Sequence, residues 1–338
     1  MKKVYYKFTL FFSSNLLNFK KLKNSPSFGK NMQKIRFDLI KKKLGSQAIS
    51  RFAPSPTGQM HLGHIASALY VWGISQKLNG KVIIRIEDHD RQRSKEIFIK
   101  QIIEDLKWLG FLNLVPHTRE QKHSYYKQSD CTRRYEKNLS YLTRQKETFL
   151  CSCSRKNLLK QRIKNQGEIY YPGTCRFQRK IKDHKEASVR LVVEDDTFEF
   201  YDFLKGHSSQ TPSKQCGDFL LKDRNQNWTY QFSSTVDDIY DKINLIIRGE
   251  DIFHCTGRQI YLMKKLKFST EELAFVHHPL IYDPETKAKL SKSDLAQPIS
   301  SFRNKGYTPE DLLGLAAFLV GLKEDKTPLP INALEKLF

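Results

Sequence analysis

The chain has 338 residues, and 58 Lys and Arg against 36 Asp and Glu give it a formal net charge of +22. Hydrophobic residues make up 39% and aromatic residues 12% of the sequence, which is enough to bury a sizeable core and excludes wholesale disorder. No apolar run comes near the roughly 20 residues that a membrane-spanning helix needs, so no membrane association is expected.

The cysteine content argues against a disulfide framework, because the residues are few and unevenly spaced. A reducing compartment, the cytoplasm, is therefore expected. The sequence contains six of them: Cys131, Cys151, Cys153, Cys175, Cys216 and Cys255.

The positive charge is concentrated at the N-terminus, where residues 1–45 hold 12 Lys or Arg and a single acid, Asp38. We expect this segment to be a disordered basic extension. A weak organelle-targeting peptide, or an upstream reading with Met32 as the true start, are alternatives that the sequence leaves open. The remaining residues are also basic, which favours a polyanionic partner such as nucleic acid, although a generally basic composition would have the same charge.

Regular patterning begins at residue 46. A short strand ends at Phe52, and after a Pro- and Gly-rich turn the apolar spacing predicts a helix that Asn79 and Gly80 end. Residues 81–87 alternate as a strand, and a second helix follows that Gly110 closes. This order over residues 46–138 predicts the first half of a parallel α/β sheet.

The pattern changes over residues 139–232, where closely spaced cysteines, two strand-like stretches and a hairpin turn predict an inserted α+β subdomain. Residues 233–300 return to the α/β pattern, because an apolar run suited to a buried strand precedes a helix. Thr308, Pro309 and Glu310 have the cap, first-turn proline and acid of a helix start. Residues 301–338 are therefore expected to be a short helical segment.

The first chemical motif spans Arg51–His64 and joins a strand end, a rigid turn and a helix start that carries two histidines. Helix N-terminal amides favour phosphate, Gly63 lets a purine or ribose approach the backbone, and His61 and His64 can donate hydrogen bonds to oxyanions. A lone His-x-x-His is more often a cap or part of the core, but its place directly after a sheet strand favours nucleotide binding.

The second motif is the short basic loop Lys289–Ser293. Its lysines, Lys289 and Lys292, can neutralise charge on a departing pyrophosphate. Such a pentapeptide alone would normally be a solvated surface turn. Because it follows the two-histidine motif in this order, it is stronger evidence for a nucleotide site.

Together these motifs resemble those of class I aminoacyl-tRNA synthetases, and longer strings over roughly residues 48–320 narrow the resemblance to the glutamyl branch. It implies a Rossmann-type parallel-sheet catalytic domain with a zinc-bearing insertion, in which His61, His64, Lys289 and Lys292 act in catalysis and His61, Gly63, His64 and Lys292 bind ATP. The strings are Arg85–Asp90 with Arg93, Tyr230–Phe232 before Val236–Asp238, and Ile247–Asp251 followed by Arg258–Ile260.

A glutamate site needs cations for two carboxylates and an anion for the ammonium, and guanidinium forks suit carboxylates better than lysine does. The resemblance implies Arg51 and Arg248 as the cations and Glu87 as the anion. It also implies that Ala53, Ser55 and Tyr230 complete the pocket. Which arginine takes which carboxylate stays open, and Glu87 and Arg248 forming only an internal ion pair is the structural alternative.

Cys151, Cys153 and Cys175 could hold a tetrahedral zinc ion if a fourth ligand is present. No fourth cysteine or histidine lies at the usual spacing, and His184 is the nearest histidine. The arrangement is similar to that of the glutamyl-queuosine tRNA(Asp) synthetases, in which a tyrosine is the fourth ligand, and this resemblance implies Tyr171. Water or His184 completing the site, or no metal at all, are the alternatives.

Only 45 residues follow Ser293, whereas a full glutamyl-tRNA synthetase continues into a helical domain that reads the anticodon. The resemblance therefore implies a monomer that activates L-glutamate with ATP and Mg²⁺ without tRNA, holds a structural Zn²⁺, and transfers glutamate to queuosine at the wobble position of tRNA(Asp). The rivals are a truncated glutamyl-tRNA synthetase that charges the 3′ end of tRNA(Glu), and a non-catalytic RNA-binding module.

Overall fold

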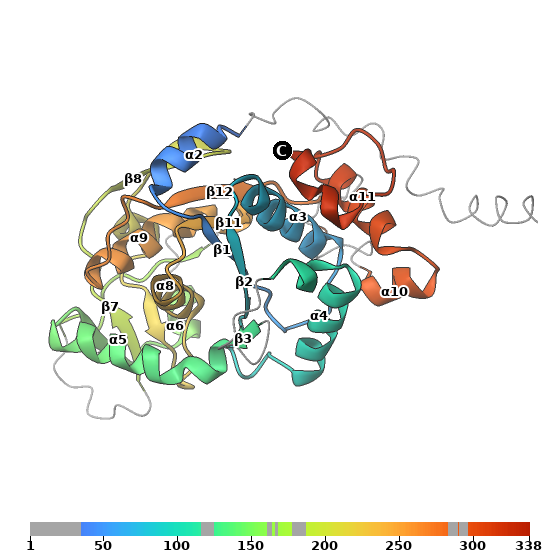
Figure 1. Ribbon diagram of the computed structural model, residues 1–338. Helices are drawn as coiled ribbons and strands as arrows, with labels where there is room; N and C mark the ends of the chain where they lie inside the picture. The colour runs from blue at the N-terminus through green and yellow to red at the C-terminus, as the bar shows by residue number, and fades with distance from the viewer. Residues whose placement is uncertain are drawn as a thin grey trace, which may run out of the picture.

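The computed structural model describes residues 35–115, 125–160, 164–165, 168–177, 187–282, 290 and 297–338 (Figure 1). The expectation of disorder for residues 1–34 lies outside the described residues. For residues 35–45 it differs from the structure, because helix α2 (Phe37–Leu44) buries Ile40 and Leu44 in the main core. Two apolar side chains four residues apart on one helix face explain this docking.

The main sheet is built mainly from parallel strands. The first set, in the order β1-β2-β3, is wholly parallel, and the second, β11-β12-β8-β9, is parallel except for the edge strand β9. The two sets meet where Asn244 N donates to Ile49 O (3.1 Å) and Asn244 Oδ1 accepts from Ile49 N (2.8 Å). The strands are β1 (Ile49–Phe52), β2 (Lys81–Ile86), β3 (Tyr125–Lys127), β8 (Phe198–Asp202), β9 (Gly206–Gln210), β11 (Leu245–Gly249) and β12 (Ala274–His278).

Helix α3 (Leu62–Lys77) is the central helix of the main core. Eleven of its residues are buried, and Trp72 packs against Phe52 of β1 and Phe111 with ring centres 5.2 and 4.6 Å apart. Figure 1 shows α11 (Pro309–Leu319) beside it and α10 (Ile299–Asn304) farther out. The further helices of this part are α4 (Glu96–Trp108), η2 (Phe111–Leu114), α8 (Tyr230–Tyr240), η4 (Glu250–Cys255), α9 (Thr256–Lys265) and η6 (Ile331–Leu337).

The predicted start of the last long helix is confirmed at Thr308, which caps α11 together with an acid. Thr308 Oγ1 accepts from Asp311 N (3.2 Å), and Asp311 Oδ2 accepts from Thr308 N (2.8 Å). The acid that completes this capping box is Asp311, three residues after the cap, whereas Glu310 lies in the first turn.

The inserted subdomain has an antiparallel sheet in the order β10-β7-β4 and its own apolar cluster around Tyr135, Leu191 and Phe232. Strands β8 and β9, which the sequence places inside the insertion, instead extend the main sheet next to β12. The remaining elements are η3 (Gln128–Cys131), α5 (Thr132–Arg144), β4 (Thr148–Cys151), α6 (Arg155–Lys160), β5 (Lys164–Asn165), β6 (Glu168–Ile169), β7 (Ser188–Leu191), α7 (Pro212–Gln215) and β10 (Leu220–Lys222).

Helices long and apolar enough to cross a bilayer are absent from the described part of the chain.

Candidate active site

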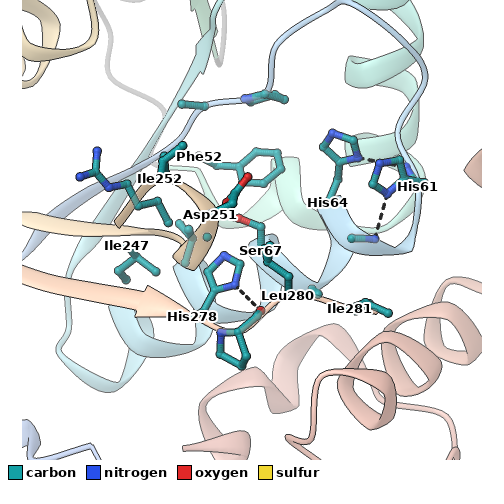
Figure 2. Close-up of a pocket in the computed structure, with 18 of the residues that line it drawn as sticks. Phe52, His61, His64, Ser67, Ile247, Asp251, Ile252, His278, Leu280 and Ile281 are labelled. Carbon is teal, nitrogen blue, oxygen red and sulfur yellow. Dashed lines mark hydrogen bonds between the residues drawn. The ribbon is translucent and has the colours of Figure 1, made fainter. Parts of the chain in front are cut away.

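A cavity of about 300 Å³ lies where β1, β2 and β11 end and α3 begins (Figure 2). In parallel α/β sheets, ligands bind beyond the carboxyl ends of the strands. The cavity therefore lies where such a fold places its ligand. It brings together most of the side chains that the sequence predicts for two different tasks, namely Arg51, Ala53, His61, Gly63, His64, Glu87, Tyr230 and Arg248.

Two histidines form one end of this cavity (Figure 2). His61 is the N-cap of α3, where its Nδ1 accepts from Gly63 N (3.1 Å), and His64 Nδ1 accepts from His61 N (3.2 Å). A neutral imidazole that accepts at Nδ1 carries its hydrogen on Nε2. The capping role and the functional role are thus compatible, because capping fixes the tautomer that can donate to a phosphate oxygen.

Gly63 is required by the histidine beside it. A Cβ atom at this position would lie 2.9 Å from His61 Cε1, closer than real Cβ contacts. The cap geometry of His61 therefore depends on the absence of a side chain two residues later.

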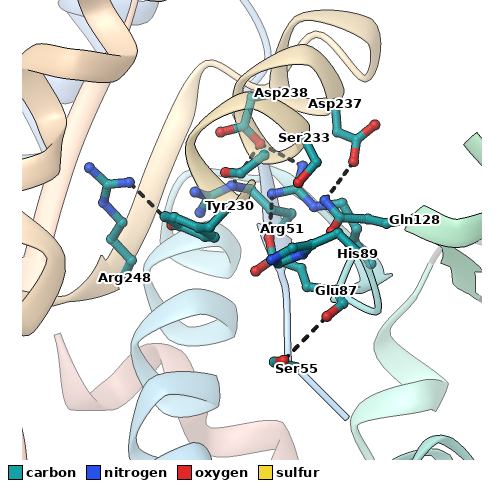
Figure 3. Close-up of polar contacts among 12 residues, drawn as sticks. Arg51, Ser55, Glu87, His89, Gln128, Tyr230, Ser233, Asp237, Asp238 and Arg248 are labelled. Atoms are coloured by element: carbon teal, nitrogen blue, oxygen red, sulfur yellow. Dashed lines mark hydrogen bonds and ion pairs between the residues drawn. The ribbon is translucent and has the colours of Figure 1, made fainter. Parts of the chain in front are cut away.

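A buried network of four charged side chains contributes Arg51 and Glu87 to the wall of this cavity (Figure 3). Asp238 Oδ1 accepts from Arg51 Nε (3.0 Å) and from Arg85 Nη1 (2.7 Å), and Arg85 Nη2 donates to Glu87 Oε1 (3.1 Å). Burial raises the pKa of Glu87, while Arg85 acts in the opposite direction. Two guanidinium groups and two carboxylates balance one another, so this network carries no net charge when all four are ionised.

Arg248 has a different environment, because all of its hydrogen-bond partners are neutral. Its Nη1 donates to Gln259 Oε1 and its Nη2 to Thr256 Oγ1 (2.8 Å), and its Nε lies 2.8 Å from His277 Nε2. Among the described residues, no carboxylate lies within ion-pair distance of this guanidinium. The side chain is only 5% exposed, so a buried positive charge faces the cavity without a protein anion.

His277 holds Arg248 as a neutral acceptor. Its Nδ1 lies 2.6 Å from Asp202 Oδ2, so Nδ1 carries the hydrogen and Nε2 accepts from the arginine. Burial is the main reason that the pKa of His277 falls to about 4. The line Asp202–His277–Arg248 thus fixes the guanidinium in the cavity wall.

The family assignment comes from a family model described as "tRNA synthetases class I (E and Q), catalytic domain", which matches residues 47–327. The chain belongs to this family. Glutamate--tRNA ligase 1 of Thermoanaerobacter sp. (strain X514) is 32% identical over 289 residues, which are 82% of this chain and 59% of that protein. Glutamyl-Q tRNA(Asp) synthetase of Symbiobacterium thermophilum is also 32% identical, over 85% of this chain and 91% of that protein.

The fold is similar to that of a glutamate tRNA ligase from Elizabethkingia meningosepticum, which was crystallised in complex with its amino acid. The two align with a TM-score of 0.66 and 26% identity, over 81% of this chain and 61% of the other. The chain thus spans about three fifths of the glutamate--tRNA ligases that it matches.

Three of the predicted site residues are not among those that line the cavity. Ser55 is exposed, and its Oγ donates to Glu87 O (3.2 Å). Lys289 and Lys292 lie outside the described residues. Leu290, between them, is buried against the cavity, and its backbone N donates to Ile281 O (2.9 Å).

The ion pair between Glu87 and Arg248, which was the structural alternative to a glutamate site, is not formed. Glu87 pairs with Arg85 instead, while Arg248 has the neutral partners given above. The alternative in which Glu87 and Arg248 only pair with each other is therefore wrong.

A second, larger cavity of about 780 Å³ lies between the main sheet and the insertion. Tyr230 lines both cavities. Arginine side chains are frequent in its wall, where they favour a polyanionic ligand. These are Arg93, Arg155, Arg190, Arg224 and Arg258.

The three predicted thiols come together beside this second cavity, which Cys153 and Tyr171 line. The sulfur atoms of Cys151, Cys153 and Cys175 all lie within 4.8 Å of one another, and the Cys153 and Cys175 sulfurs are 3.5 Å apart. The Tyr171 hydroxyl accepts from Cys175 N (2.8 Å) and interacts with the thiols of Cys151 and Cys175. His184, the alternative ligand, lies outside the described residues.

Asp202 and His277, which hold the Arg248 guanidinium in place, were not predicted from the sequence. His277 lies at the end of an apolar strand that pairs with the strand of Arg248, and a histidine in such a strand could have indicated a polar partner. A polar residue in a strand buried on both faces normally needs a specific partner.

The low pKa of His277 predicts a stability effect with a definite sign. In the unfolded chain histidine takes up a proton below about pH 6.5, while native His277 stays neutral to about pH 4. Stability is therefore lost as pH falls from about 6.5 to 4, by about 3 kcal/mol from this residue. The free energy of unfolding of the wild type, measured by urea denaturation, should fall toward that of His277→Asn across this range. A difference that is constant with pH would contradict the assignment.

Proposed function

We propose that the protein activates L-glutamate with ATP and then transfers the glutamyl group to queuosine at the wobble position of tRNA(Asp). The observation that carries the first part is Arg248, a buried cation without an acidic partner among the described residues, in a cavity that two phosphate-suited histidines also line. A buried charge of this kind is strongly unfavourable until an anion pairs with it.

Glutamate matches the charges of this cavity. With two carboxylates and one ammonium it has a net charge of −1, which is opposite in sign to the charge of Arg248. Glu87 lies in the same wall and supplies a carboxylate for the ammonium group, and Arg51 supplies a second guanidinium for the other carboxylate. Asp251, at the exposed edge of the cavity, lies outside this buried set.

Activation needs alignment and charge stabilisation rather than a covalent enzyme intermediate. A glutamate carboxylate oxygen attacks the α-phosphorus of ATP, and the bond to pyrophosphate breaks. His61 and His64 donate to the phosphate oxygens, while Lys292, with Lys289, neutralises the leaving pyrophosphate. Mg²⁺ would accompany ATP and offset part of the phosphate charge.

The acceptor assignment is supported by the inserted subdomain. The larger cavity beside it adjoins the glutamate cavity at Tyr230 and is rich in arginine. Cys153 and Tyr171 line it, and both belong to the Cys and Tyr cluster that the resemblance connects with queuosine-modifying enzymes. Charging of the 3′ end of tRNA(Glu) is the rival, since glutamate--tRNA ligases match the chain with similar identity.

Zinc fits the thiol cluster. A tetrahedral ion with Zn–S bonds of about 2.3 Å places sulfur atoms roughly 3.8 Å apart, close to the separation of Cys153 and Cys175. Cys151, Cys153, Cys175 and Tyr171 would hold the ion. The metal would join β4 to the segment around Tyr171 and so stabilise the wall of the larger cavity.

Arg248→Gln tests the glutamate site. Loss of the charge should cost about 3 kcal/mol of binding and raise the KM for glutamate in ATP–pyrophosphate exchange by roughly 100-fold, with little change for ATP. Arg303→Gln, at an exposed arginine of α10, is the matched control. Equal increases in KM for ATP and glutamate would argue against a role of Arg248 in glutamate binding.

Labelled glutamate tests the acceptor. The protein should catalyse pyrophosphate exchange without tRNA, and label should then appear on queuosine-containing tRNA(Asp) but not on queuosine-free tRNA(Asp) or tRNA(Glu). Label on tRNA(Glu) instead, with exchange that needs this tRNA, would favour the rival. If no pyrophosphate exchange occurred with or without tRNA, a non-catalytic RNA-binding module would be the remaining interpretation.

Metal analysis tests the cluster. Purified protein should contain about one zinc per chain, Cys153→Ser should lose it, and Cys255→Ser should retain it, because Cys255 lies outside the cluster. Tyr171→Phe should release zinc to a chelator faster than the wild type does. An unchanged release rate would remove Tyr171 from the ligand set.

A further inference from the structure

His89 lies at the junction of the two cavities. It follows β2 by three residues, is half-buried, and lines the larger cavity together with Tyr230, whose ring centre is 6.4 Å away. Glu87, two residues earlier, lines the smaller cavity and interacts electrostatically with His89. A group at this place is close to both the bound glutamyl group and a molecule that enters from the larger cavity.

A relay of buried side chains fixes the orientation and tautomer of His89 (Figure 3). Its Nδ1 lies 2.8 Å from Gln128 Oε1, and Gln128 Nε2 donates to Asp237 Oδ2 (2.8 Å). Asp237 also accepts from Tyr135 OH (2.7 Å) and Arg134 Nη1 (3.0 Å), so it acts as an acceptor and turns the Gln128 amide oxygen toward His89. His89 therefore carries its hydrogen on Nδ1, and the neutral ring has a basic Nε2.

The other titratable groups at the junction are poorly suited to take a proton. Glu87 is ion-paired with Arg85, and burial raises the pKa of Tyr230, which keeps it a phenol. Asp90 Oδ2 is paired with Arg93 Nε at 2.6 Å. His89 differs from these three groups, because its Nδ1 is hydrogen-bonded to the neutral Gln128 amide and its Nε2 is the acceptor nitrogen to which a proton can be transferred.

We propose that His89 is the general base of the transfer step, an inference that rests on the proposed function. The acceptor hydroxyl oxygen attacks the carbonyl carbon of glutamyl-adenylate, and its proton passes to His89 Nε2. The new ester bond forms, the bond between the carbonyl carbon and the phosphate oxygen breaks, and its electron pair leaves with AMP. The imidazolium then returns its proton to water. Gln128 and Asp237 are positioning residues, because they hold the ring and stabilise its positive charge.

The test separates activation from transfer. His89→Asn retains an amide donor near the position of Nδ1, and His89→Ala leaves space for added imidazole. In rapid-quench assays with preformed glutamyl-adenylate and a mixture of queuosine-containing tRNA(Asp) and tRNA(Glu), both variants should transfer glutamate roughly 100- to 1,000-fold more slowly. ATP–pyrophosphate exchange should fall less than about fivefold, and imidazole should raise transfer by His89→Ala at least tenfold.

The controls keep the outcomes distinct. His207→Asn, at an exposed histidine of β9, should transfer at the wild-type rate, and Gln128→Met should slow transfer without rescue by imidazole. A transfer rate of the His89 variants within threefold of wild type, or equal losses in exchange and transfer, would overturn the role of His89 alone. Wild-type protein without glutamate-dependent exchange would overturn the proposed function and this inference with it.

Discussion

The site depends on one buried carboxylate, that of Asp238 on α8. It accepts from Arg51 of β1 and Arg85 of β2, so a single acid joins two neighbouring strands to the helix that carries Tyr230. Arg85 in turn holds Glu87 at the end of β2. Removing one member of such a buried network leaves its partners unpaired, which normally costs several kcal/mol. The positions of the groups that would bind a substrate are therefore coupled to the stability of the sheet.

Arg248 lies outside this balanced network, and in the proposed function its charge would select an anionic ligand. Neutral donors and acceptors hold its guanidinium in place without neutralising it, so its charge remains for a ligand. A protein carboxylate at the same position would satisfy the cation and weaken the attraction for any anion. The neutral His277, which Asp202 orients, holds the Arg248 guanidinium rigidly and leaves its positive charge in place.

The sequence was informative where the chemistry is local. The strand into Phe52, the helix with both histidines and the capped start of α11 follow from short-range patterns, and the structure confirms them. Non-local pairings were not accessible. Strand β8 joins β12 across more than seventy residues, and Asp202 reaches His277 only because of that pairing. Basic composition likewise concealed helix α2, whose two buried side chains gain their partners only from the folded sheet.

The two cavities are also consistent with the two successive steps of the proposed function. Phosphate-suited groups lie at the smaller cavity and arginines at the larger one, while Tyr230 forms part of both walls. An adenylate held by Arg248 and the α3 histidines would present its carbonyl carbon toward this shared wall, because the glutamate and nucleotide ends are already held elsewhere. An acceptor that enters from the insertion side then meets the reactive carbon without passing the nucleotide. In the proposed function the residues between the two cavities, rather than those that bind glutamate, would therefore decide which hydroxyl is used.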